Sequence, residues 1–139
     1  MTPGGWIIDA SIAVKWFRAR EIEPDRELAE KLIADGSIRT TTLCVFEVGN
    51  TLARKTRDSN EQIGGKLRTL VGYCGPPIDL QVADYVSASR LTRRYGITFY
   101  DASYVAIAER LGRTVVSADR DLLDPGLAVD LAAAVNAES

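Results

Sequence analysis

The stretch Ile97-Thr98-Phe99-Tyr100-Asp101-Ala102-Ser103-Tyr104-Val105-Ala106-Ile107-Ala108 places one acid at the start of a strongly apolar segment. At about 100° per residue, the apolar side chains of residues 104–111 cover well over half of a helix, so we expect this helix to be largely buried. Its polar side consists of Ser103, Glu109 and Arg110. A carboxylate at the mouth of a buried helix, here Asp101, needs water, backbone N–H groups or a metal ion as its partner.

Two short apolar runs elsewhere in the chain each lead to an acid. Residues 6–8 end at Asp9 and turn directly into a helix, and the buried strand expected over residues 113–117 is followed by Asp119. Strands that alternate with helices predict an α/β fold with a mostly parallel sheet covered on both faces. Because ligands bind outside the carboxyl ends of such strands, both acids are expected at the functional edge of the sheet.

The remaining chain also reads as short strands and longer helices. Helices are predicted over residues 25–33, 43–57, 61–71 and 81–95, and weak strands over residues 37–41, 78–80 and 127–131. In the helix over residues 81–95, the side chains expected to face the core are Val82, Tyr85, Val86, Ser89 and Leu91.

Length and composition indicate one globular domain, residues 1–139. The only early apolar run, residues 6–17, is interrupted by Asp9 and Lys15 and is too short to cross a bilayer, so no membrane partner is expected. Cys44 and Cys74 are far apart in sequence and form no metal-type pair. We interpret them as reduced thiols of a cytoplasmic protein.

The chain contains no histidine, and its net charge is −2. The absence of histidine removes the commonest general base, the nucleophile pairs that depend on it, and most zinc sites. Any enzymatic chemistry would therefore rest on carboxylates, which together with water suit Mg²⁺ or Mn²⁺. A nucleic-acid partner would have to be held by a local basic patch, since the overall charge is not basic.

Five acids could meet at the sheet edge: Asp9, Glu47, Asp101, Asp119 and Asp121. Each one alone has an ordinary structural explanation, as a helix cap, a turn residue or an exposed helix residue. Gathered in one place, like charges repel unless a cation neutralises them. A cluster of three or four carboxylates is what one or two divalent ions require to activate water for displacement at phosphorus.

Four motifs in order resemble those of one known family: Ile7-Ile8-Asp9-Ala10-Ser11, Phe46-Glu47-Val48-Gly49-Asn50-Thr51-Leu52, Tyr100-Asp101-Ala102-Ser103-Tyr104 and Ser117-Ala118-Asp119. Together they resemble the PIN-domain family and, within it, the VapC-type ribonuclease toxins of toxin–antitoxin pairs. The resemblance extends from Ile7 to about Leu123. It implies a three-layer α/β/α sandwich around a mostly parallel sheet and an endoribonuclease that depends on Mg²⁺ or Mn²⁺.

Carried over residue by residue, the resemblance also implies functional positions. The metal-binding and catalytic acids would be Asp9, Glu47, Asp101 and Asp119, and the possible pocket residues are Ser11, Asn50, Ser117 and Asp121. Ser117 stands where the family more often has threonine, and Asp121 competes with Asp119 as the fourth acid. Cations that could hold flanking phosphates are Lys15, Arg18, Arg54, Lys55, Arg90 and Arg93.

The resemblance further implies an RNA substrate, a cognate antitoxin and a homodimer. The helices over residues 27–33 and 43–57 are where we expect an apolar groove for a partner helix. One alternative is a PIN-like module that binds RNA or protein without turnover. A phosphatase that forms an aspartyl-phosphate is disfavoured, because it would need a second acid at the position of Ser11.

Overall fold

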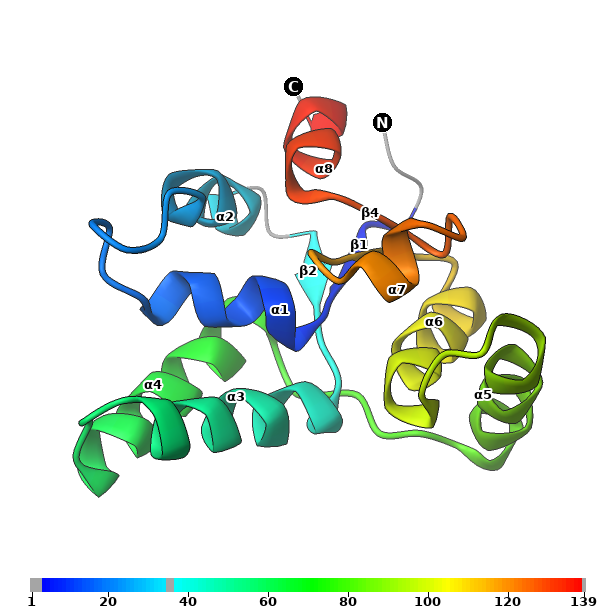
Figure 1. Ribbon diagram of the computed structural model, residues 1–139, viewed down its shortest axis with the longest axis horizontal. Coiled ribbons are helices and arrows are strands. Elements are labelled where there is room, and N and C mark those ends of the chain that lie inside the picture. Colours follow the sequence, from blue (N-terminus) through cyan, green and yellow to red (C-terminus); the bar gives the residue numbers. More distant parts are fainter. Residues whose placement is uncertain (1–3, 35–36, 139) are drawn as a thin grey trace.

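A computed structural model describes residues 4–34 and 37–138 of the chain. Its centre is a four-stranded, all-parallel sheet with the strand order β2-β1-β3-β4 (Figure 1). The strands are β1 (Trp6–Ile8), β2 (Ile38–Arg39), β3 (Thr114–Val116) and β4 (Ala128–Val129). The predicted parallel α/β sheet is therefore confirmed.

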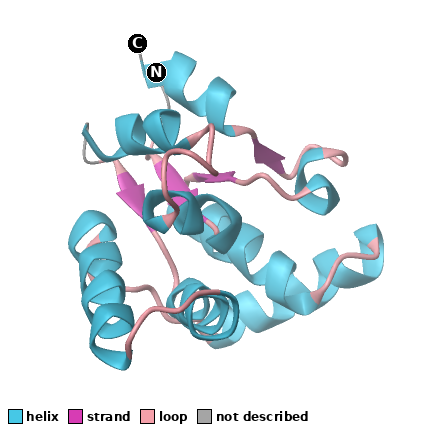
Figure 2. Cartoon of the chain, turned by 60° about the vertical axis from the view of Figure 1, so that its left-hand side comes forward, coloured by secondary structure: helices cyan, strands magenta, loops and turns pink. Residues whose placement is uncertain are grey.

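Helices lie on both faces of this sheet and extend beyond it (Figure 2). They are α1 (Ala10–Ala13), which continues as the 3₁₀ helix η1 (Val14–Phe17), α2 (Arg26–Ala34), α3 (Thr42–Lys55), α4 (Asn60–Cys74), α5 (Val82–Tyr95), α6 (Phe99–Leu111), α7 (Arg120–Leu123) and α8 (Leu131–Glu138). Helices α3 and α4 form one packed pair, and α5 and α6 form another. This arrangement agrees with the expected α/β/α sandwich.

The core is centred on β1, β3 and α6. The apolar side chains of β1 and β3 are almost completely buried, as the short apolar runs predict for strands covered on both faces. Helix α6 is buried continuously from Ala102 to Ala108, which confirms the expectation of a buried helix. Ser103, expected on its polar side, is buried as well, and its Oγ donates a 2.6 Å hydrogen bond to Tyr100 O.

The predicted inward face of α5 is wrong except at Leu91. Val82 and Val86 are 75% and 54% exposed, and Tyr85 and Ser89 also face solvent. The buried residues of the helix are Asp84, Ala88 and Leu91. Asp84 can be buried because Arg110 of α6 donates to it from Nε at 2.9 Å, an ion pair across the two helices that apolar periodicity does not reveal.

Two smaller features differ from the predicted elements. Ile78 forms a single parallel bridge to Thr41 in place of a strand over residues 78–80. Helix α8, which begins at Leu131, is absent from the predicted elements. Within residues 4–34 and 37–138, no helix combines the length and the apolar character needed to cross a bilayer.

Candidate metal centre

The carboxyl ends of β1 and β3 lie side by side at the point where the chain changes direction across the sheet. From β1 the chain first builds β2 on one side and later β3 on the other, which creates a crevice between neighbouring strand ends. Ile8 pairs with Val116, so the residues that follow them, Asp9 and Ser117, emerge together. Gly112, with φ of 64°, ends α6 and returns the chain into β3, so the first turn of α6 lies at the same edge.

Asp9 is the most deeply placed acid of this edge, with only 4% of its surface exposed. Ser11 Oγ donates to its Oδ1 at 2.6 Å, and Ser117 Oγ donates to its Oδ2 at 2.5 Å. The backbone N–H of Ile12 also donates to Oδ1, so Asp9 caps α1 as its structural explanation predicts. Burial raises the pKa of Asp9 to about 6, although the two serine hydroxyls partly oppose this increase.

The two serines connect Asp9 to the next acid in the cluster. Ser11 Oγ accepts a 2.8 Å hydrogen bond from Ala118 N, and Ser117 Oγ accepts one of 2.9 Å from Asp119 N. Each hydroxyl thus donates its proton to Asp9 and accepts a proton from the turn that precedes α7. The position of Asp119 relative to Asp9 is therefore set by a short hydrogen-bonded network.

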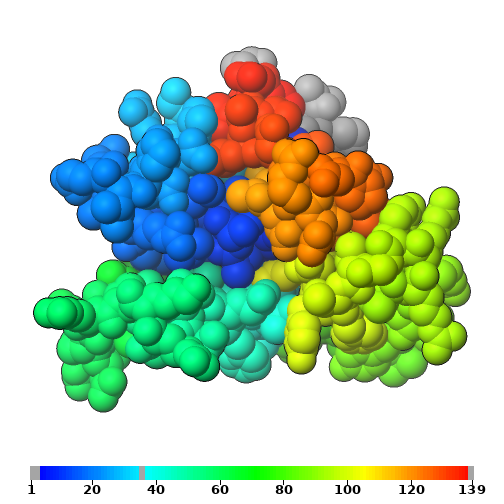
Figure 3. Space-filling model, in the orientation of Figure 1, coloured from blue at the N-terminus to red at the C-terminus, as the bar shows by residue number. Residues whose placement is uncertain are grey.

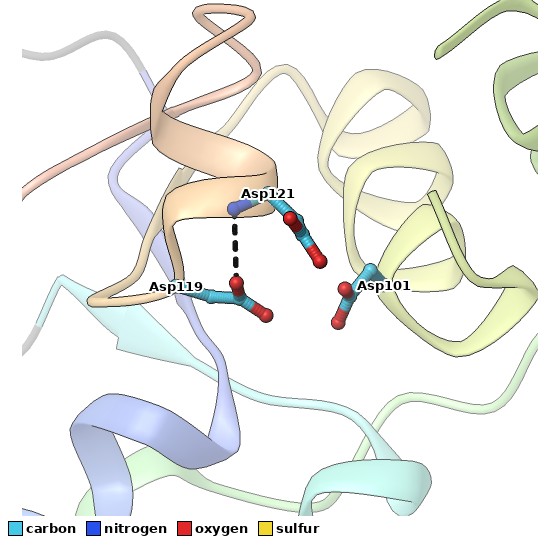
Figure 4. A group of neighbouring side chains, drawn as sticks. All are labelled: Asp101, Asp119 and Asp121. Carbon is cyan, nitrogen blue, oxygen red and sulfur yellow. Dashed lines mark hydrogen bonds between the residues drawn. The ribbon is translucent and has the colours of Figure 1, made fainter. Parts of the chain in front are cut away.

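Asp101, Asp119 and Asp121 converge in front of this network (Figure 4). One carboxylate oxygen from each lies within 4.8 Å of the others, a spacing that allows all three to contact one cation. They come from two elements, since Asp101 is in the first turn of α6 while the other two begin α7. Asp101 and Asp119 are half-buried and Asp121 is exposed, so solvent reaches the cluster from one side.

Asp101 does not cap helix α6, so the structural explanation of this acid as a helix cap is wrong. Thr98 caps α6, and its Oγ1 accepts a 3.0 Å hydrogen bond from Asp101 N, which leaves the Asp101 carboxylate free of this structural task. Asp119 does act as the cap of α7 through a 2.9 Å bond from Asp121 N to its Oδ1. Its other oxygen points into the space shared with Asp101, as Figure 4 shows.

The acids repel one another in this arrangement. Burial raises the pKa of Asp101 to about 6, and the nearby charges of Asp119, Asp9 and Glu47 contribute to the increase. In the described part of the chain, no lysine or arginine forms an ion pair with any of these carboxylates. The positive ends of α1, α6 and α7 relieve only part of this repulsion.

Glu47 approaches the same edge from α3. It is half-buried, and Tyr104 Oη donates a 2.6 Å hydrogen bond to its Oε1. Asn50, one turn further along α3, is exposed, and its side chain forms no hydrogen bond among the described residues. The structure thus places Asp9, Glu47, Asp101, Asp119, Asp121, Ser11 and Ser117 together and leaves Asn50 outside their hydrogen bonds.

Comparisons with known proteins agree with this geometry. The profile of the PIN domain matches residues 6–126, which include every acid described above. The chain belongs to the PIN-domain family. It is 29% identical to Ribonuclease VapC3 of Pyrobaculum aerophilum over 126 residues, covering 85% of this chain and 92% of that protein.

Two further matches support membership in the PIN-domain family. Exonuclease VapC9 of the same organism is 32% identical over 88 residues, which cover 58% of this chain and 61% of the relative. The crystal structure of PAE2754 from Pyrobaculum aerophilum superimposes with a TM-score of 0.72 at 25% identity, covering 96% of this chain and 88% of the other. The fold of this chain is therefore shared with that solved structure.

Two residues that shape the site of this PIN domain were not predicted to do so. Thr98 relieves Asp101 of capping, and Tyr104 fixes one oxygen of Glu47. Tyr104 could have been found from the sequence, because a tyrosine expected inside a buried helix requires a partner for its hydroxyl. Thr98 carries a weaker signal, since a threonine three residues before an acid also fits a loop.

The donor set fits a hard divalent cation. Every convergent side-chain ligand is a carboxylate or hydroxyl oxygen, and the chain has no histidine to compete. Both cysteine thiols are buried, and burial raises the pKa of each to about 12. Oxygen ligands with an open, solvent-facing side are typical of Mg²⁺ and Mn²⁺ sites rather than of structural zinc sites.

Proposed function

We propose that this protein is a divalent-metal-dependent endoribonuclease and the toxin of a toxin–antitoxin pair. The observation that carries the proposal is the convergence of Asp101, Asp119 and Asp121 beside the buried Asp9, without an ion-pairing cation in the described residues. Mutual repulsion makes such a cluster costly unless an ion occupies it. The similarity to Ribonuclease VapC3 over most of both chains supports RNA as the substrate.

Asp9, Asp101 and Asp119 are the proposed ligands of Mg²⁺ or Mn²⁺, with Asp121 as a further candidate. When bound, the ion would supply charge neutralisation at the scissile phosphate and activation of water. Asp9 holds the serine hydroxyls in place, and through them it holds the backbone that carries Asp119. These contacts make the cluster rigid before any substrate arrives.

Glu47 is proposed either as a further ligand of the ion or as the acceptor that orients the attacking water. Tyr104 Oη donates to its Oε1, and Oε2 forms no hydrogen bond within the described residues. The charge of Glu47 contributes to the raised pKa of Asp101, which supports a common role for the two carboxylates. Because the chain has no histidine, a carboxylate is the best available group for accepting a proton from water.

The first test is cleavage of a mixed pool of structured RNAs in the presence of Mg²⁺, Mn²⁺ or EDTA. Wild type should cleave with either metal, whereas EDTA or the substitution Asp101→Asn should abolish cleavage. Asp124→Asn is the matched control because this exposed acid pairs with Arg120, outside the cluster, and should retain activity. Cleavage that persists in both EDTA and Asp101→Asn would contradict the proposal, and folding of each variant is checked by circular dichroism.

A circular RNA distinguishes internal from terminal cleavage. An endonuclease opens a circle, whereas an exonuclease requires an end, and one relative carries the name of an exonuclease. We expect the circular RNA and its linear form to disappear at similar rates. Degradation of the linear form alone would replace the endonuclease proposal with an exonuclease.

The proposed partners are an antitoxin and a second copy of the chain, in the cytoplasm. A groove between η1, the loop after it, α3 and α4 is lined by Val14, Phe17, Ile22, Thr51 and Leu52, with cations at its rim. Of the two helices expected to form a partner groove, α3 contributes to it. Ile22 is 73% exposed there, which supports docking of an amphipathic antitoxin helix.

The exposed valines of α5 support a homodimer, and sedimentation of the purified chain tests it.

A further inference from the structure

Helix α6 exposes apolar surface only near its ends. Its residues 102–108 are buried all round, yet Tyr100 is 63% exposed and Phe99 is 40% exposed in the first turn. Both are directly before Asp101 in the chain. Two exposed aromatic residues therefore lie in the same helical turn as Asp101, where they add little to the core.

Helix α3 presents a similar ring on the other side. Its core-facing residues are Cys44, Val48 and Leu52, and Phe46 lies almost opposite to them at helical spacing. Phe46 is 69% exposed and immediately precedes Glu47. An exposed phenylalanine in this position does not stabilise the helix packing.

A hydrogen bond between α6 and α3 indicates how Tyr100 and Phe46 are arranged relative to each other. Tyr104 reaches across from α6 to Glu47 on α3, so this side of α6 faces the first turns of α3. Tyr100 is one turn before Tyr104 and lies on the same side of α6. The first turns of α3 (teal) and α6 (yellow) flank a hollow in the surface, with the start of α1 (blue) behind it (Figure 3).

We propose that Phe46 and Tyr100 stack on unpaired nucleobases on either side of the phosphodiester held at the acid cluster. This inference rests on the proposed function, and it assigns the substrate as a single-stranded or looped segment of RNA. Flat aromatic rings suit the faces of bases, and a base can reach a ring only when it is free of a helical stack. Aliphatic side chains at these positions would offer apolar surface without this geometry.

The charge along α3 agrees with a nucleic-acid strand more than with an apolar protein surface. Arg54 and Lys55 in the last turn of α3 and the following Arg57 are exposed, and none of them forms an ion pair among the described residues. Lys15 and Arg18, also expected to bind phosphates, are instead held by Glu23. The free cations near the end of α3 can contact phosphates beyond the stacked base.

The test compares variants that keep or remove the ring at each position. Phe46→Leu and Tyr100→Leu retain apolar volume and helix propensity but lose the aromatic face, whereas Phe46→Tyr and Tyr100→Phe retain it. Binding of an unstructured RNA oligonucleotide is measured by fluorescence anisotropy in EDTA, where metal-dependent cleavage is stopped. Each leucine variant should weaken binding by about tenfold, and the ring-retaining variants should stay within about twofold of wild type.

Two further measurements make the outcome decisive. Binding of a fully paired duplex should be the same in all variants. The fluorescence of 2-aminopurine in the unpaired oligonucleotide should be quenched less by each leucine variant than by the variant that retains a ring at the same position. Ring-dependent binding without any cleavage would support the stacking proposal while the nuclease proposal fails. Cleavage and binding that are equal in leucine and ring-retaining variants would overturn the stacking proposal alone. Loss of self-association in the leucine variants, with RNA binding intact, would also overturn it and assign the rings to a protein interface.

Discussion

Tyr104 Oη donates a 2.6 Å hydrogen bond to Glu47 Oε1, so the helix that presents Asp101 also fixes the acid of α3. Tyr104 is almost completely buried and is three residues after Asp101 on α6. Both residues lie within one turn of each other. The geometry of two acids from distant parts of the chain is thus controlled by a single buried helix.

Removing this hydroxyl should loosen Glu47 without disturbing the core. Tyr104→Phe keeps the ring, and we expect a loss of only about 1 kcal/mol in the free energy of unfolding. Metal affinity or cleavage should fall by roughly tenfold, as is usual when a group that orients a ligand is removed. Isothermal titration with Mn²⁺ and chemical denaturation measure the two effects.

A double-mutant cycle with Glu47→Gln isolates the hydroxyl's action through Glu47. If Tyr104 acts only by holding this carboxylate, its removal should have little further effect in the Glu47→Gln background. Fully additive effects of the two substitutions would show that Tyr104 acts by another route.

Asp101→Asn should have opposite effects on stability with and without metal. The substitution removes a charge from a crowded, half-buried site, so the metal-free variant should be more stable than wild type. It should also lose most of the increase in melting temperature that Mn²⁺ gives wild type. Differential scanning fluorimetry in EDTA and in Mn²⁺ measures both, with Asp124→Asn as the control expected to behave like wild type.

Substitution of Asp119 should impair activity more than substitution of Asp121. Asp119 is half-buried and its backbone N–H donates a hydrogen bond to Ser117 Oγ, whereas Asp121 is exposed. Asparagine can still cap α7 at position 119, so Asp119→Asn tests the charge rather than the fold. We expect a loss of roughly 100-fold or more in kcat for Asp119→Asn and roughly tenfold for Asp121→Asn. Equal losses would indicate that both act as direct ligands.

The metal-free protein should lose stability as the pH rises through the window between the ordinary carboxyl pKa and about 6. Asp9 and Asp101 have a pKa of about 6 in the folded state against 3.8 ordinarily, so the folded protein holds more protons in this window. Its free energy of unfolding therefore falls with increasing pH there. Glu23 and Asp84 have lowered pKa values, and their contribution is lost only at lower pH.

The affinity for metal should rise with pH over the same window in which the stability of the metal-free protein falls. A divalent ion competes with protons for the carboxylates, so Mn²⁺ affinity should increase as the pH rises. Melting curves in EDTA and in saturating Mn²⁺ should diverge with rising pH. Parallel curves would contradict a site built on Asp9 and Asp101.

The ion pair between α5 and α6 should contribute strongly to stability. Arg110→Met leaves the buried Asp84 without its cation, and we expect a loss of about 2–4 kcal/mol in the free energy of unfolding. Arg120→Met removes an arginine from an exposed pair and should cost less than about 1 kcal/mol. Urea denaturation of the two variants compares the sites directly, and similar losses would contradict a special role for Asp84.

The sequence was sufficient for the elements whose burial is uniform. Residues 6–8, 115–116 and 102–108 are buried and, apart from Ser103, apolar or aromatic, so periodicity and length were enough to assign these elements. The parallel sheet then placed Asp9 and Asp119 at one edge by general topology. Their action as metal ligands stays a prediction, as does the extent of the domain over residues 1–139.

Prediction failed where a polar contact decides which side of a helix is buried. In α5 the apolar residues Val82 and Val86 face solvent because Asp84 turns inward to meet Arg110. Likewise, the cap of α6 is Thr98 and not Asp101, a choice between two suitable residues that local propensity cannot make. Both outcomes depend on partners in three dimensions.

The pairing of Ile8 with Val116 also determines how this protein can lose activity. A shift of β1 by one residue in one direction would put Ile8 in the place of Asp9, and in the other direction it would put Asp9 in the buried place of Ile8. Either shift removes the carboxylate from the site, and the second one also places a charge in the core. A slipped pairing of these strands therefore disturbs the core together with the site, so inactive but folded forms are expected from side-chain changes, from the lack of a metal ion or from a bound partner.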